Sequence, residues 1–96
     1  MKKVVIKKSV DKGKKLTAIF TREDGSTKKI SFGSAGMDDF TKKKDEAQKK
    51  RYLARHRARE NWNNPESAGA LSRWILWNKT SRQASIADFK RRFNYQ

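Results

Sequence analysis

The sequence contains no cysteine, one histidine and one proline among its 96 residues. Without cysteine the chain has no disulfide framework, no thiolate metal ligand and no cysteine nucleophile, and this composition suits a reducing compartment. A single histidine argues against zinc sites of the usual histidine-rich kind and against histidine-paired nuclease centres. We therefore expect a protein that is not an enzyme, with no catalytic residue, no cofactor, no metal site and no small-molecule substrate.

Long apolar runs are also missing. The run Val4–Ile6 is flanked by lysine pairs and has only three residues, fewer than a signal peptide uses. No stretch approaches the ~20 apolar residues of a membrane-spanning helix, so we expect no membrane span. Leu, Ile, Val and Phe supply only 17 residues, a share at which a highly charged chain is often disordered. The sequence predicts one small domain, residues 1–96, with a modest core.

Positive charge, in contrast, is abundant. The chain has 25 Lys and Arg against 10 Asp and Glu, and its formal net charge is +15 at pH 7. Repulsion among these charges opposes compaction, so an anionic partner is the natural source of additional stability. Two classes of partner fit this charge, nucleic acid and the acidic surfaces of other proteins.

The first third of the chain, residues 1–33, predicts a β meander. Leu16, Ala18 and Phe20 alternate with more polar neighbours, which is the pattern of a strand with one apolar face. Asp24-Gly25 predicts a tight turn before a third strand. Because a small sheet with one apolar face must be covered, we expect an α+β fold: a three-stranded antiparallel meander followed by a long basic helix and two shorter C-terminal helices.

The long basic helix is expected over residues 38–60, with Asp38 or Asp39 as its N-cap. Charge spacing supports it through two pairs four residues apart, Asp45 with Lys49 and Glu46 with Lys50. The expected apolar stripe is thin and consists of Phe40, Ala47, Ala54 and Ala58. His56 lies between arginines, and we expect it to be a surface or packing residue.

Nine cations of this helix are candidates for contact with an anion or a protein partner. They are Lys42, Lys43, Lys44, Lys49, Lys50, Arg51, Arg55, Arg57 and Arg59. They could follow phosphate groups, or form a solvated face as most charge runs do. Nothing in the run specifies particular bases.

A second helix, residues 65–78, is expected to begin with Asn64 as cap and Pro65 in the first position. Its apolar residues cover a wide arc, too wide for so small a core. We therefore expect an exposed surface whose interface anchors are Arg73, Trp74, Ile75, Trp77 and Arg82. The alternative is that the tryptophans are simply the core of the domain.

A last short helix is expected over residues 85–94. Ser85 and Asp88 have the spacing of a capping box in which Asp replaces Glu. Ile86, Phe89 and Phe93 would line one side of this helix and pack on the rest of the domain.

The segment from Lys50 to Lys79 reads KRYLARHRARENWNNPESAGALSRWILWNK. The residues that carry a resemblance are Arg51, Tyr52, Ala54, Arg55, His56, Arg59, Glu60, Trp62, Pro65, Ala68, Gly69, Ser72, Arg73, Trp74, Leu76 and Trp77. With these residues the segment resembles a family of small, basic, uncharacterised proteins of nucleocytoplasmic large DNA viruses (giant viruses). The resemblance extends back to Phe32-Gly33 and forward to residues 84–86.

The resemblance implies a location in the virion, after assembly in the host cytoplasm or a viral factory. Small basic proteins of such particles serve as minor capsid (cement) proteins on acidic surfaces of other capsid proteins, or as core proteins that neutralise packaged DNA. We expect the first, structural role, because a wide Trp-rich face fits a protein socket better than it fits phosphate groups. The alternative is a virion-associated nucleic-acid-binding protein.

Overall fold

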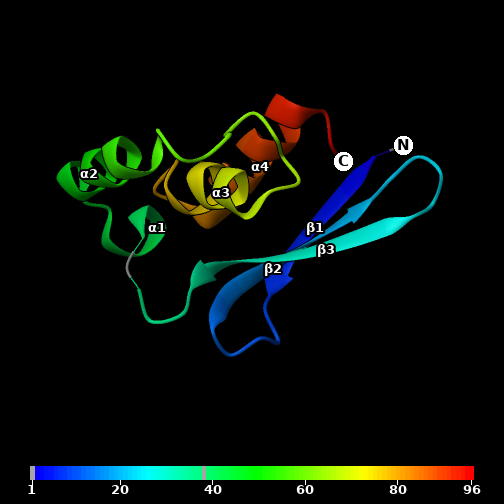
Figure 1. The fold of residues 1–96 in the computed structure, drawn as a ribbon, viewed down its shortest axis with the longest axis horizontal. Coiled ribbons are helices and arrows are strands. Elements are labelled where there is room, and N and C mark those ends of the chain that lie inside the picture. The colour runs from blue at the N-terminus through cyan, green and yellow to red at the C-terminus, as the bar shows by residue number, and fades with distance from the viewer. Residues whose placement is uncertain (1, 38) are drawn as a thin grey trace.

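The computed structural model of the chain describes residues 2–37 and 39–96. Three strands come first, β1 (Lys3–Lys8), β2 (Lys14–Thr21) and β3 (Thr27–Ser34), and they form an antiparallel sheet in the order β1-β2-β3 (Figure 1). Helical segments follow on one side of this sheet. The α+β fold with a strand meander followed by helices is therefore confirmed.

One face of the sheet is apolar and buried, as the alternation in β2 predicts. Leu16 lies opposite Phe32, and Ala18 lies opposite Ile30, so apolar side chains of neighbouring strands share a face. The buried residues of this face are Val4, Leu16, Ala18, Phe20 and Phe32. Asp24-Gly25 forms the expected turn, in which Gly25 has a φ of +87°.

The two ends of the chain meet at the edge of β1 (Figure 1). The Val4 amide donates to the Gln96 carbonyl at 3.0 Å, and the Gln96 amide donates to the Lys2 carbonyl at 3.0 Å. The Tyr95 ring packs on Phe20, with centroids 5.4 Å apart. These contacts tie the last helix to the sheet and close the domain.

The prediction of a single long basic helix is wrong. The structure has two helices here, α1 (Phe40–Lys43) and α2 (Glu46–His56). Lys44 between them has a left-handed φ of +56°, which ends α1. Asp39 caps α1, and Asp45 caps α2 by accepting from two backbone amides; Asp38 lies outside the described residues. The second capping carboxylate thus starts a new helix where charge spacing predicts a continuous one.

The expected stripe of alanines is also wrong. In α2 the buried side chain is Tyr52, while Ala47 and Ala54 are exposed, as is Ala58 beyond its end. Neither expected ion pair is among the ion pairs of the described residues: Asp45 is occupied as a cap, and the Lys49 Nζ donates to the Asn78 carbonyl at 2.7 Å. Burial of the large aromatic ring outweighs burial of small methyl groups, and this rotates the helix.

The second helix is shorter than expected. Ser67, and not Asn64, caps α3 (Ala68–Leu71), which continues into a π-helical turn, η1 (Ser72–Leu76). The segment from Trp62 to Ser67 is a series of turns, in which the Asn64 side chain accepts from the Glu66 amide. Pro65 therefore lies in a turn and does not begin the helix.

The last helix, α4 (Arg82–Phe93), begins three residues before the expected start. Its cap is Ser81, while Ser85 is fully buried inside the helix and its Oγ accepts from the Lys79 amide at 3.0 Å. The proposed capping box is therefore wrong. The expected apolar side is correct: Phe89 is fully buried, and Ile86 and Phe93 pack against the core.

Gly33 of β3 packs tightly against Leu76 of the helical layer. Its φ is +78°, and a Cβ placed on it would lie 2.6 Å from Leu76 Cδ1. Gly25 has a similar backbone conformation but open space around it. Only Gly33 therefore combines a left-handed backbone with a packing constraint.

This pair of glycines gives a matched test of the packing. Gly33→Ala should lower the free energy of unfolding by about 2–4 kcal/mol, because backbone strain and overpacking add. Gly25→Ala should cost only about 1–2 kcal/mol, from strain alone. Urea denaturation followed by circular dichroism measures both, and equal losses would contradict the close contact between Gly33 and Leu76.

Candidate functional site

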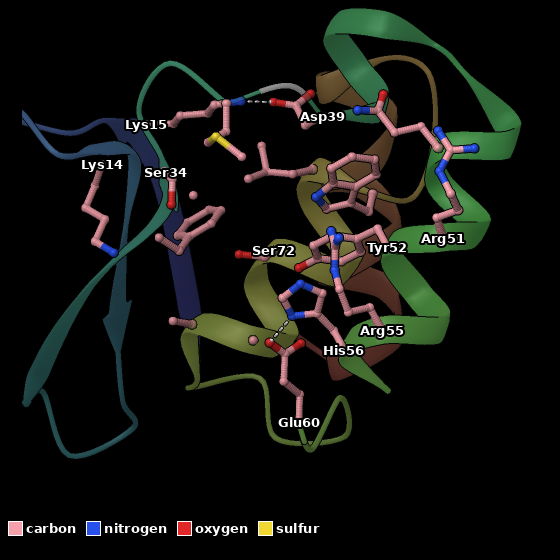
Figure 2. A pocket seen from close by; sticks show the side chains of 18 of the residues that line it. Lys14, Lys15, Ser34, Asp39, Arg51, Tyr52, Arg55, His56, Glu60 and Ser72 are labelled. Carbon is pink, nitrogen blue, oxygen red and sulfur yellow. Dashed lines mark hydrogen bonds and ion pairs between the residues drawn. The ribbon is translucent and has the colours of Figure 1, made fainter. Parts of the chain in front are cut away.

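A cleft of about 600 Å³ lies between the sheet and the helices (Figure 2). Lys14 and Lys15 contribute to it from the start of β2, and Arg51, Arg55 and His56 from α2. The floor is apolar and aromatic, and it is formed by Phe32, Tyr52, Leu76 and Trp77. The cleft thus combines cations on two opposite walls with flat rings between them.

Three stacked rings build the helical wall of the cleft. The Tyr52 ring lies between Trp77 and His56, with centroid distances of 4.4 Å and 4.2 Å and interplanar angles of 10° and 24°. Tyr52 and His56 are one helical turn apart, so α2 presents both rings on one side. The stack becomes more accessible from Trp77 outward, since the His56 side chain is 34% exposed.

The Tyr52 hydroxyl is held neutral. Burial raises its pKa to about 12, the nearby Glu60 carboxylate acts in the same direction, and a hydrogen bond with Ser72 opposes them. A phenol with such a pKa remains protonated near neutral pH. Tyr52 therefore acts as a packing ring and a hydrogen-bonding group, not as a proton-transfer group.

Glu60 fixes the outer end of the stack. Its two carboxylate oxygens contact the His56 Nδ1 at 3.0 Å and accept from the Trp62 Nε1 at 2.9 Å (Figure 2 shows the first contact). A Cβ on Gly69 would lie 3.0–3.2 Å from carbon atoms of Glu60, so a glycine there gives the carboxylate room. His56 is thus a held packing residue, which agrees with its expected role.

Asp39 fixes the opposite end of the cleft. It accepts from the Lys15 Nζ at 2.6 Å, from the Thr41 hydroxyl and from the Lys42 amide (Figure 2 shows the first contact). Burial alone would raise the pKa of the carboxyl group, but the hydrogen bonds from Lys15 and Thr41 outweigh it, and the pKa lies below its usual value. Lys15 is therefore partly neutralised, while Lys14 has no ion pair among the described residues.

Of the nine expected contact cations, α2 and the segment after it expose five. Lys50, Arg51, Arg55, Arg57 and Arg59 are all exposed, and no ion pair within the described residues involves any of them. Only Arg51 and Arg55 line the cleft. Lys42, Lys43 and Lys44 are exposed on and just after α1, away from this wall.

Lys49 is the cation that the structure removes from the expected set. Its Nζ donates to the Asn78 carbonyl and lies 4.6 Å from the centroid of the Phe40 ring. Burial lowers the pKa of this lysine, and the positive charge of Arg73 lowers it further. Lys49 therefore ties α2 to the loop after η1 instead of facing a partner.

The expected Trp-rich docking surface is wrong as well. Ile75 is completely buried and Trp77 is 7% exposed, because both pack into the core beneath α2. Trp74 is half-buried, and its indole nitrogen donates to the Trp62 carbonyl at 2.9 Å. Trp77 is therefore a core residue, and Trp74 packs against the core.

Arginines hold the Trp74 side chain. The guanidinium carbons of Arg73 and Arg92 lie 4.1 Å and 3.7 Å from the centroid of its ring. Arg73 also donates to the Trp77 carbonyl at 2.9 Å, and burial lowers its pKa, with Arg92 adding to the effect. Arg73 is thus a packing residue, and of the five expected anchors only Arg82 is exposed.

Sequence reasoning missed Lys14 and Lys15. They lie in a strand, and their place opposite α2 depends on how the sheet and helices pack, which a linear pattern does not contain. One local signal was available: Lys14 and Lys15 directly follow the turn at Gly13 and begin a strand, and residues next to loops commonly bind ligands. The described part of the chain contains no group of three or more His, Cys, Asp or Glu side chains that could hold a metal ion.

The Lys15–Asp39 pair gives a pH-dependent prediction. Because the pKa of folded Asp39 is lowered, its contribution is complete above the unfolded value of about 4 and is lost as the pH falls through the folded value. Lys15→Met should cost about 2–3 kcal/mol of unfolding free energy at pH 7 and clearly less at pH 3. Urea denaturation at both pH values measures this, and an equal loss at both would rule out the charge-based account.

No helix within the described residues is long and apolar enough to cross a membrane.

Comparison with known proteins places the chain in one family. No curated protein matches the sequence significantly. No solved structure matches the fold significantly. Residues 4–56, which run from β1 to the end of α2 and make up more than half of the chain, match a protein family, and the chain therefore belongs to the Family of unknown function (DUF5754).

Proposed function

We propose that this protein is a non-enzymatic nucleic-acid-binding protein that holds phosphate groups with the exposed cations of α2 and of the neighbouring cleft. The observation that carries the proposal is the set of five exposed cations between residues 50 and 59 that have no ion pair among the described residues. Neutralisation of phosphates by such cations releases counterions, which favours binding.

The shape of α2 supports this proposal. Ala47 and Ala54 are exposed between the cations of α2, so the outer face of this helix carries small side chains that allow close approach to its backbone. Figure 1 shows α2 at one end of the long axis of the molecule, opposite the β2–β3 hairpin. A helix with small residues at its surface and cations around them suits the major groove of a duplex or the backbone of a single strand.

A salt titration tests the proposal. Labelled DNA, double-stranded and single-stranded, is titrated with the protein at several salt concentrations, and binding is followed by fluorescence anisotropy. We expect submicromolar binding at physiological salt and a steep log-log slope, near −5 for about six duplex phosphate contacts. Binding to both DNA forms that disappears by about 0.15 M salt would contradict the proposal, because it would represent nonspecific attraction alone.

Charge-matched variants locate the interface. Arg51→Gln/Arg55→Gln should reduce the magnitude of the salt slope by about 2, since each lost phosphate contact removes about one unit. Lys3→Gln/Lys29→Gln changes the net charge equally, but both lysines are exposed on the outer face of the sheet. This control should change the slope by less than about 1, and equal changes in the two variants would argue against an interface on α2.

A second candidate is the minor capsid role. Because Trp77 is buried and Trp74 is half-buried, a Trp-rich docking face no longer supports this role. The outer face of the sheet offers a different docking surface. Val5 is 55% exposed and lies opposite Ile19 in the register, with Lys3, Lys7 and Lys29 exposed on the same face. An apolar centre with a cationic rim is typical of a surface that docks on an acidic protein.

The proposed setting follows from the resemblance of residues 50–79 alone. Under it, the protein is in the virion of a large DNA virus and passes through the host cytoplasm or a viral factory during assembly. Stepwise dissociation of purified particles separates the two candidates. Recovery with the DNA-containing core supports nucleic-acid binding, whereas recovery with the capsid shell in particles without DNA supports the capsid role.

A further inference from the structure

A second cleft, of about 650 Å³, adjoins the first one. It is lined by the end of β1 and the turn that follows, by the start of β2, and by Arg82 and Ile86 of α4. Lys14, Lys15 and Gly36 line both clefts. The two clefts therefore adjoin at these residues, and we refer to the two together as the joint groove.

The joint groove carries surplus positive charge along its whole length. The second cleft adds Lys8, Lys12 and Arg82 to the cations already described. The carboxylates that line the joint groove all have partners within the protein. Asp39 binds Lys15, Glu60 contacts His56, and Asp11 accepts from the Gly13 amide at 3.0 Å. A chain of anionic groups, rather than one isolated anion, complements such a row of charges.

Exposed apolar side chains lie along the same groove. The exposed large hydrophobic residues of the described chain are Val5, Val10 and Met37. Val10, 95% exposed, lines the second cleft, and Met37, 63% exposed, lines the first. These two side chains contribute little to the core of a chain that has few apolar residues, so their placement among lysines points to a ligand that is both anionic and apolar.

We propose that the joint groove binds a segment of single-stranded nucleic acid, with phosphates on its cations and bases against Met37 and Val10. This inference rests on the proposed function and names the form of nucleic acid. A single strand offers unstacked bases together with phosphates, whereas a duplex keeps the faces of its bases inside the stack. A duplex would use the exposed cations on the outer face of α2 instead.

Removal of the apolar contacts without a change of charge tests the inference. The probes are a labelled twelve-residue oligothymidylate and a labelled twelve-base-pair duplex, each titrated with the full chain. Val10→Ser/Met37→Ser should weaken binding of the oligothymidylate about fivefold or more, because burial of an aliphatic side chain against a base is worth roughly 1 kcal/mol. The salt slope should not change, and duplex affinity should remain within about twofold.

Val5→Ser is the matched control, since Val5 is exposed on the outer face of the sheet and away from both clefts. It should leave the affinity for both probes within about twofold, and circular dichroism should show every variant folded. Unchanged oligothymidylate binding in Val10→Ser/Met37→Ser, or an equal loss for both probes, overturns the joint groove as a single-strand site. If the unaltered protein binds neither probe, the proposed function itself fails.

Discussion

Contacts between cations and aromatic rings hold the helical layer of this protein together. Arg73 and Arg92 lie over Trp74, Lys49 lies over Phe40, and the Lys2 Nζ lies 5.0 Å from the Tyr95 centroid. The chain has a net charge of +15 and few apolar residues, and it uses some of its cations to cover the rings at the edge of its apolar core. Long basic side chains cover ring faces with their stems while their charged groups reach water or a carbonyl.

This use of cations divides them into two classes. In the first class, Arg73, Lys49 and Lys15 contact rings, carbonyls or the buried Asp39. The charges of these residues stabilise the fold. The exposed cations of α2 have no such partner within the described part of the chain. Net charge alone does not separate the two classes, since a buried arginine and an exposed one contribute equally to it. The separation decides which cations are available to an anionic partner.

The strands were predictable because their signal is local. Alternation in Leu16–Phe20 and the Asp24-Gly25 turn follow from backbone geometry, and the structure has both. The helices were harder, because the side of α2 that faces inward is the one on which Tyr52 stacks on Trp77. That contact joins residues 25 positions apart, so no pattern within one helix could show it.

The candidate site shares this limitation. Arg51 and Arg55 were expected as contact residues from their charge, but Lys14 and Lys15 enter the cleft only because β2 packs opposite α2. The small number of aliphatic residues predicts a core that cannot bury Trp74 and Trp77. In the structure Trp77 belongs to the buried core together with Ile75 and Leu76, and Trp74 packs against it.

The unpaired cations of α2 make dissolved ions act in opposite directions on folding and on binding. Added electrolyte shortens the range of repulsion among these charges, which relieves the free protein. The same ions compete for phosphate groups, which loosens a bound partner. Charge repulsion within the free chain is consequently strongest in the dilute solutions in which the chain would bind a polyanion most tightly. A bound polyanion then takes the place of the missing counterions.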